Sequence, residues 1–187
     1  VVVGVIVLLA AWWYEPGPAA TPAAPPDPGG DAARLQLDTS GLEYRGLAVQ
    51  VASGWYQPEE TYFPLLDEIA ELGANAVLLC VPGTMEHATS QSIYFDLRRI
   101  PPPENLERIV GYAKGRGLHV ILMPIVLLEN PRGSEWRGVI EPPDWDAWWR
   151  EYEEFVLFFA NVAREAEADA LIVGSELVST ERFTQRW

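Results

Sequence analysis

One carboxylate in this sequence stands where a buried strand should end. The stretch DALIVGSELVST (169–180) begins as an apolar strand would, continues with a glycine and a serine, and then places Glu176. Burying a carboxylate without a partner costs free energy, so a Glu at the mouth of an apolar strand needs a reason. Either it gives and takes a proton in catalysis, or it lies in the first turn of a following helix, where the helix dipole favours it.

The alternation of strand side chains predicts where this carboxylate points. Ile172, Gly174 and Glu176 are expected on one face, and Leu171 and Val173 on the other. If Leu171 and Val173 pack against helices, Glu176 projects from the inner face of the sheet at its upper rim. Gly174 beneath it would leave room for a ligand.

Strand and helix patterns alternate along the chain. Apolar runs predict strands at 44–52, 75–81, 119–127 and 170–176, and helical spacing predicts helices at 62–73, 103–117 and 144–168. Strands that are apolar throughout are typical of a parallel sheet buried on both faces, and no glycine-rich phosphate turn follows the first one. Long loops follow the second and third strands, where a (β/α)8 barrel builds its active site. We therefore predict an α/β fold, the first half of a TIM barrel with about four βα units.

Each predicted helix has one apolar face. Leu65, Ile69 and Leu72 share a face of the first helix, and the second has a similar face made of Leu106, Ile109, Val110 and Ala113. The third helix carries an aromatic stripe, which we interpret as a face packed on the barrel rather than as a binding surface. Asp144 is a good N-cap for that helix.

Composition divides the chain into three segments. Residues 1–14 are uncharged and apolar, typical of a membrane anchor or of a secretory signal segment, and residues 15–40 form a linker rich in Pro, Ala and Gly. The half-barrel occupies residues 41–187. We therefore expect a membrane-anchored or secreted, extracytoplasmic protein that contacts the membrane through its N-terminal segment. The sequence does not begin with Met and stops soon after the fourth predicted strand, so we expect a piece of a longer chain.

Charge and metal-binding residues narrow the function. The net charge of −14 argues against nucleic acid as a partner. Cys80 is the one cysteine and lies in a buried-strand pattern, and His87 and His119 are isolated in the sequence. We expect no disulfide, no metal site and no cofactor.

Several motifs resemble one enzyme family. The stretch VGSELVSTERFTQRW (173–187) resembles the fourth-strand motif of glycoside hydrolase family 113, retaining enzymes of clan A of the (β/α)8 glycosidases. The stretches GLHVILMPIVLLEN (117–130) and SEWRGVI (134–140) are similar to the same family in the same order, and the resemblance covers about residues 44–187. It implies a TIM-barrel hydrolase of a β-linked polysaccharide or oligosaccharide, such as a mannan, with Glu176 as general acid/base. The clan nucleophile lies on strand seven, which this chain does not contain, so the resemblance implies that the chain alone is inactive.

Two departures from the family pattern bear on the substrate. Ser175 stands before the acid/base, where most of the clan has Asn, although family 113 tolerates a small residue there. Met123-Pro124-Ile125 stands where many relatives have Lys-Pro-His, so any substrate contact made by those polar groups is lost.

Five further residues are candidates for substrate binding. Trp55 would stack on a sugar or plug the barrel mouth, and the polar pair after the third strand would contact hydroxyl groups or serve as ordinary loop residues. Arg137 would line the cleft or instead pair with an acid such as Glu141 or Glu181. The candidates are Trp55, Glu129, Asn130, Trp136 and Arg137.

Two other functions compete with hydrolysis by a glycosidase. A catalytically inactive barrel would bind envelope glycans or protein partners, and it is favoured if no carboxylate exists on strand seven. A metal-dependent hydrolase usually needs a histidine cluster on early strands, and the first predicted strand, YRGLAVQVA, has none.

Overall fold

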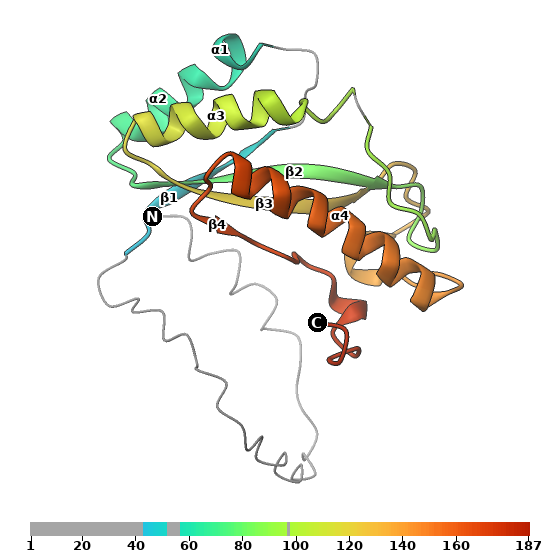
Figure 1. Cartoon of the computed structure of the whole chain (residues 1–187). Coiled ribbons are helices and arrows are strands. Elements are labelled where there is room, and N and C mark those ends of the chain that lie inside the picture. The colour runs from blue at the N-terminus through green and yellow to red at the C-terminus, as the bar shows by residue number, and fades with distance from the viewer. Residues whose placement is uncertain (1–42, 52–56, 97) are drawn as a thin grey trace, which may run out of the picture. The chain divides into compact units, whose positions relative to one another are not determined.

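The computed structural model describes residues 43–51, 57–96 and 98–187 (Figure 1). Residues from Arg45 onward form one compact unit around a four-stranded sheet. The strands are β1 (Gly46–Gln50), β2 (Ala76–Met85), β3 (His119–Leu128) and β4 (Ala170–Leu171). The helices are α1 (Pro58–Thr61), α2 (Phe63–Glu71), α3 (Pro103–Gly115) and α4 (Trp145–Glu165), with short 3-10 helices η1 (Arg137–Val139) and η2 (Val178–Thr180).

The sheet is parallel, and its strands lie side by side in chain order. β1 pairs with β2, β2 with β3, and β3 with β4, each in parallel register. Helices connect the strands and lie on one side of the sheet (Figure 1). The predicted series of four βα units is confirmed.

The hydrophobic core lies between the sheet and these helices. α4 contributes its aromatic stripe, in which Trp148 and Phe159 are fully buried, and the predicted apolar face of α3 is buried as well. The Asp144 side chain accepts hydrogen bonds from the backbone N–H groups of Asp146 and Ala147, so it caps α4 as predicted. Free Cys80 is buried in β2.

The first predicted helix differs from the prediction in two ways. The predicted helix 62–73 forms as α2, and it is preceded by a short helix, α1, that was not predicted; the two meet at Tyr62, and Pro64 has no N–H with which to join them in one helical ladder. The buried residues of α2 are Leu66 and Ile69, whereas Leu65 and Leu72, which were predicted to share the apolar face with Ile69, are exposed.

The sequence predicted strands buried on both faces, and this prediction is wrong for β1 and β3. β2 is buried along nearly its whole length and continues to Met85, four residues beyond the predicted end. β3 alternates between buried and half-buried residues, and β1 exposes Leu47 and Ala48. In the described part of the chain β1 is an edge strand of the sheet.

β4 is much shorter than the predicted 170–176. The Ile172 N–H still donates to the Leu122 carbonyl at 2.9 Å. The next bond of a parallel ladder would come from the N–H of residue 124, and Pro124 has none. The carbonyl of Val173 instead accepts a hydrogen bond from the Tyr152 hydroxyl of α4 at 2.7 Å. Pro124 thus ends the pairing between β3 and β4. Beyond this point the chain leaves the sheet, and the hydrogen bond from Tyr152 attaches it to α4.

Three of the sequence predictions lie outside the described residues: the anchor or signal segment 1–14, the linker 15–40 and the candidate Trp55. Among the helices of the described ranges, none has both the length and the apolar character that crossing a membrane requires.

Candidate active site

Loops from three neighbouring strands meet at the carboxyl edge of the sheet. The loop after β3 is tied to the end of β2 by backbone hydrogen bonds from Glu129 to Met85 and from Glu141 to Ala88, both 2.8 Å. η1 in this loop contacts η2, which follows β4. The edge predicted to carry the active site is therefore assembled from segments far apart in the sequence.

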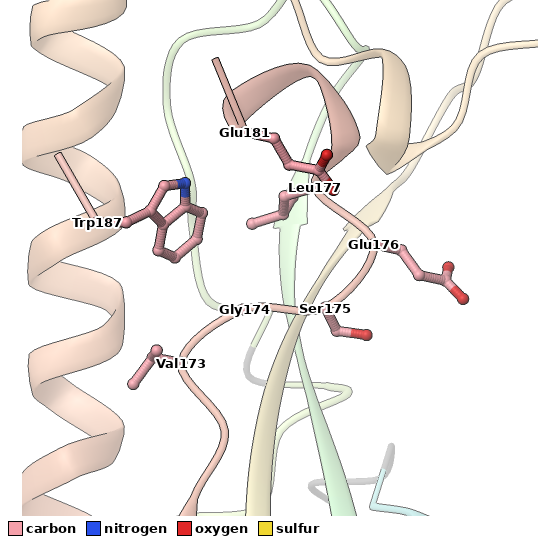
Figure 2. Close-up of a pocket in the computed structure, with 7 residues that line it drawn as sticks. All are labelled: Val173, Gly174, Ser175, Glu176, Leu177, Glu181 and Trp187. Carbon is pink, nitrogen blue, oxygen red and sulfur yellow. The ribbon is translucent and has the colours of Figure 1, made fainter. Parts of the chain in front are cut away.

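Glu176 lies on the segment that follows β4, beside a shallow pocket of about 270 Å³ (Figure 2). Its carboxyl group points away from Trp187 and Val173, which lie on the opposite side of the chain (Figure 2). The side chain is 44% exposed. The pocket is lined by Val173, Gly174, Ser175, Glu176, Leu177, Glu181 and Trp187.

The predicted alternation of side chains fails at Gly174. A Cβ on Gly174 would lie 2.8 Å from the Trp187 ring and 3.6 Å from the Tyr152 hydroxyl, so this position faces α4 and not the direction of Glu176. Glu176 itself has φ +57°, a left-handed backbone that costs a non-glycine residue about 1 kcal/mol. Because the chain turns here instead of continuing as a strand, Gly174 and Glu176 do not share a face.

Arg137 contacts the Glu176 carboxylate. Its Nη2 lies 2.5 Å from Glu176 Oε2, and its side chain is 23% exposed. The two acids suggested as its partners were wrong: Arg137 pairs with Glu176, while Glu141 pairs with Arg182 at 2.7 Å. The Arg137–Glu176 ion pair thus joins η1 to the segment that follows β4.

The charge of Arg137 acts on a residue of β2. Burial raises the pKa of the Cys80 thiol, and the charge of Arg137 acts in the opposite direction. Cys80 alternates with Leu79 and Val81, which belong to the core under the helices, so its side chain is on the other face of the sheet.

Glu129 and Asn130 are engaged by neighbouring loop residues. Both oxygens of Glu129 lie near Arg99, at 2.8 and 3.1 Å. The side-chain amide of Asn130 donates to the Glu86 carboxylate, and the backbone carbonyl of Asn130 lies 2.5 Å from His87 Nδ1. These contacts hold the β3 loop against the β2 loop.

The Trp136 ring is partly exposed and packs on the backbone of η1. The side chain is 43% exposed, and a Cβ on Gly138 would lie 2.2 Å from the ring. The indole therefore rests directly on the Gly138 backbone, and a larger residue there would displace it. The exposed side of this ring remains open for contact.

Sequence reasoning missed Trp187 and Glu181 as pocket residues. The Trp187 ring packs edge-on against Trp149 with ring centroids 5.2 Å apart, and its Nε1 donates to the Thr180 carbonyl at 3.3 Å. Trp187 is 13 residues from Gly174, so no local pattern indicated that the two meet. Within the described ranges no group of His, Cys, Asp and Glu side chains is arranged to hold a metal ion.

Comparison with known proteins identifies the fold and the family. A "complex structure of GH113 beta-1,4-mannanase" matches with TM-score 0.67 and 23% identity, covering 78% of this chain and 50% of that one. The GH113 β-mannanase from Alicyclobacillus acidocaldarius matches with TM-score 0.69 and 24% identity, covering 79% and 49%. This chain therefore spans about half the length of these proteins, and its parallel sheet corresponds to the first half of their TIM barrel.

No protein of the curated set matches the chain. The model of Glycoside Hydrolase Family 113 matches residues 48–187, about three quarters of the chain and the whole of the half-barrel beyond the first residues of β1. The motifs at the third and fourth strands thus reflect true relationship, and the chain belongs to Glycoside Hydrolase Family 113.

Proposed function

We propose that this chain supplies the acid/base half of the active site of a retaining glycoside hydrolase, with Glu176 as general acid/base. The observation that supports it is the position of the Glu176 carboxyl group at the carboxyl edge of a parallel sheet, on the segment that follows β4 of a family 113 half-barrel. Catalytic groups of TIM barrels come from the strand ends at this edge. The Glu176 side chain is half-exposed, so a substrate can contact its carboxyl group without any rearrangement of the hydrophobic core.

The mechanism needs a second carboxylate. Retaining glycosidases hold two carboxyl groups about 5–5.5 Å apart, one to protonate the departing oxygen and one to attack the anomeric carbon. Glu176 would give its proton to the glycosidic oxygen as the bond to the sugar breaks, and later take a proton from water. The nucleophile would come from the end of strand seven, beyond the four described strands.

The proposed substrate is a β-linked polysaccharide, mannan in the first instance. Two solved structures that resemble this chain are β-mannanases, and this supports the choice of sugar. Met123 and Ile125 replace the polar residues of the family pattern with apolar ones, so we expect fewer hydrogen bonds to the sugar at β3. The exposed indole of Trp136 is a candidate platform for a sugar ring.

We also retain the proposal that residues 1–14 direct the enzyme out of the cytoplasm, as an anchor or as a signal segment. The uncharged N-terminal run and the Pro-rich linker behind it support this proposal. Protease accessibility of the half-barrel on intact cells would test it, since a cytoplasmic domain would be protected.

The central test compares Glu176→Gln with Glu181→Gln in the full-length protein that carries this chain. Both residues line the same pocket, so the second variant is a matched control for charge and location. We expect Glu176→Gln to lower hydrolysis of mannan by about 10²–10⁴-fold, the usual contribution of an acid/base group, and Glu181→Gln to have little effect. For dinitrophenyl glycosides kcat/KM should survive, because it reports formation of the glycosyl-enzyme and their leaving group needs no proton; kcat should fall, because the second step still needs Glu176 to take a proton from water.

Two results would contradict the proposal. One is full mannan hydrolysis by the Glu176→Gln variant. The other is hydrolysis by the 187-residue chain alone that Glu176→Gln abolishes, since we expect no nucleophile in that piece. Binding of mannan by the full-length protein without any hydrolysis would favour an inactive, glycan-binding barrel.

A further inference from the structure

We infer that Arg137 is a positioning residue that orients the Glu176 carboxyl group for proton transfer. This inference rests on the proposed function, and it goes beyond the role of Arg137 as a substrate contact. It is carried by the ion pair from η1 to the β4 loop and by the way both ends of that pair are held.

The backbone around Glu176 is fixed on both sides. Before it, the Tyr152 hydroxyl holds the Val173 carbonyl at 2.7 Å. After it, Leu177 is buried, and its carbonyl accepts a hydrogen bond from Thr180 Oγ1 at 2.7 Å. The left-handed backbone of Glu176 lies between these anchors. The main remaining freedom is therefore in the Glu176 side chain, and the contact with Arg137 restricts it.

Arg137 is also held in place. It begins η1, between the Trp136 ring that rests on Gly138 and the fully buried Ile140. Its Nε is buried and finds no hydrogen-bond partner among the residues that the structure describes. A buried donor without a partner is unfavourable, so local stability does not explain this placement. The contact with Glu176 explains the placement instead, because the guanidinium holds the Glu176 carboxyl group in one orientation.

The contact favours one oxygen as the site of the proton. An arginine only donates hydrogen bonds, and the carbonyl oxygen of a protonated carboxyl group is a better acceptor than its hydroxyl oxygen, so Arg137 favours Oε2 as the carbonyl oxygen. In the acid form the proton is then favoured on Oε1. That proton moves to the glycosidic oxygen as the bond from this oxygen to the anomeric carbon breaks. The bonding electron pair stays with the oxygen, and a carboxylate nucleophile bonds to the carbon.

The test measures how activity depends on the leaving group. In the full-length protein, Arg137→Gln should lower kcat/KM, which reports departure of the leaving group, by about 10- to 100-fold for phenyl glycosides and mannan, because a displaced acid protonates poor leaving groups badly. Dinitrophenyl glycosides should lose less than about threefold, because they leave without protonation. A merely structural role would lower both rates equally. Arg137→Lys should restore part of the loss, since a lysine can also donate to Oε2.

Arg182→Gln is the matched control. It removes another arginine–carboxylate pair of the same edge, the 2.7 Å contact with Glu141, without touching Glu176. We expect no dependence on the leaving group in that variant.

The outcomes separate the inference from the proposed function. If Glu176→Gln shows the leaving-group dependence and Arg137→Gln does not, the inference is overturned while the proposed function stands. If the wild-type protein hydrolyses no glycoside, both are overturned.

Discussion

Gly83 gives the sharpest stability prediction. It lies in β2 at the point where α4 crosses, and a Cβ there would lie 2.2 Å from Phe155 Cε2 and 2.8 Å from Cζ. Carbon atoms in contact are about 3.5 Å apart, so the Gly83→Ala methyl group needs the Phe155 ring to move by about 1.3 Å. Gly83 has no side chain, and this allows α4 to pack closely on β2.

The surroundings make that movement difficult. Phe155 is 2% exposed, and its ring lies 5.3 Å from the Phe159 ring and 6.0 Å from the Tyr152 ring, measured between centroids. Overpacking a core by one methyl group costs about 1–3 kcal/mol, and we expect the upper end of this range because these neighbours are themselves packed. A loss of about 3 kcal/mol corresponds to a fall in Tm of roughly 6–12 °C for a chain of this size.

The assay is urea unfolding followed by circular dichroism, with Gly111→Ala as the control. Gly111 lies in α3, where an added Cβ meets nothing within 4 Å, so alanine should stabilise the protein by about 0.5–1 kcal/mol through its higher helix propensity. In a Phe155→Ala background the cost of Gly83→Ala should largely disappear. A cost below about 1 kcal/mol, or the same cost in both backgrounds, would refute the packing argument.

Two further predictions concern hydrogen bonds that hold the strand ends. Tyr152→Phe should destabilise the protein by about 1–2 kcal/mol in urea unfolding, because it leaves the Val173 carbonyl without its 2.7 Å donor, and unchanged stability would contradict this. Asp169 lies at the other end of β4. Partial burial acts to raise the pKa of Asp169, but hydrogen bonds from the Val120 N–H and from His119 have the larger combined effect. The pKa of Asp169 is therefore below its usual value. The folded state therefore gains stability from Asp169 above its unfolded pKa of about 3.9 and loses it as the pH falls through the lower folded value. The destabilisation of Asp169→Ala, about 1 kcal/mol at pH 7, should shrink in unfolding measured toward pH 3, and a constant difference would refute it.

Features that depend on near neighbours in the sequence could be predicted. The apolar face of α3, the aromatic stripe of α4 and the Asp144 cap each arise from residues three or four positions apart. The order of the strands followed too, because successive βα units place each strand beside the previous one. Local periodicity and one handedness rule are enough for these features.

The end of β4 could not be predicted from its own residues. The apolar run continues to Val173, so the pattern indicated a strand through Glu176. The pairing stops because the neighbouring strand has Pro124 opposite this segment, 48 residues earlier in the chain. A strand's length is decided by its partner as much as by its own sequence, and here the partner lacks the donor.

The same early end explains why the carboxylate lies where it does. A strand continued to residue 176 would have put Gly174 and Glu176 on one face. The chain instead leaves the sheet, turns Gly174 toward Trp187 and Tyr152, and takes a left-handed backbone at Glu176. That turn directs the carboxyl group away from α4 and toward Arg137. The contact of Arg137 with Glu176, in place of the suggested Glu141 or Glu181, therefore depended on a missing N–H in β3, and no spacing within the β4 motif carries that information.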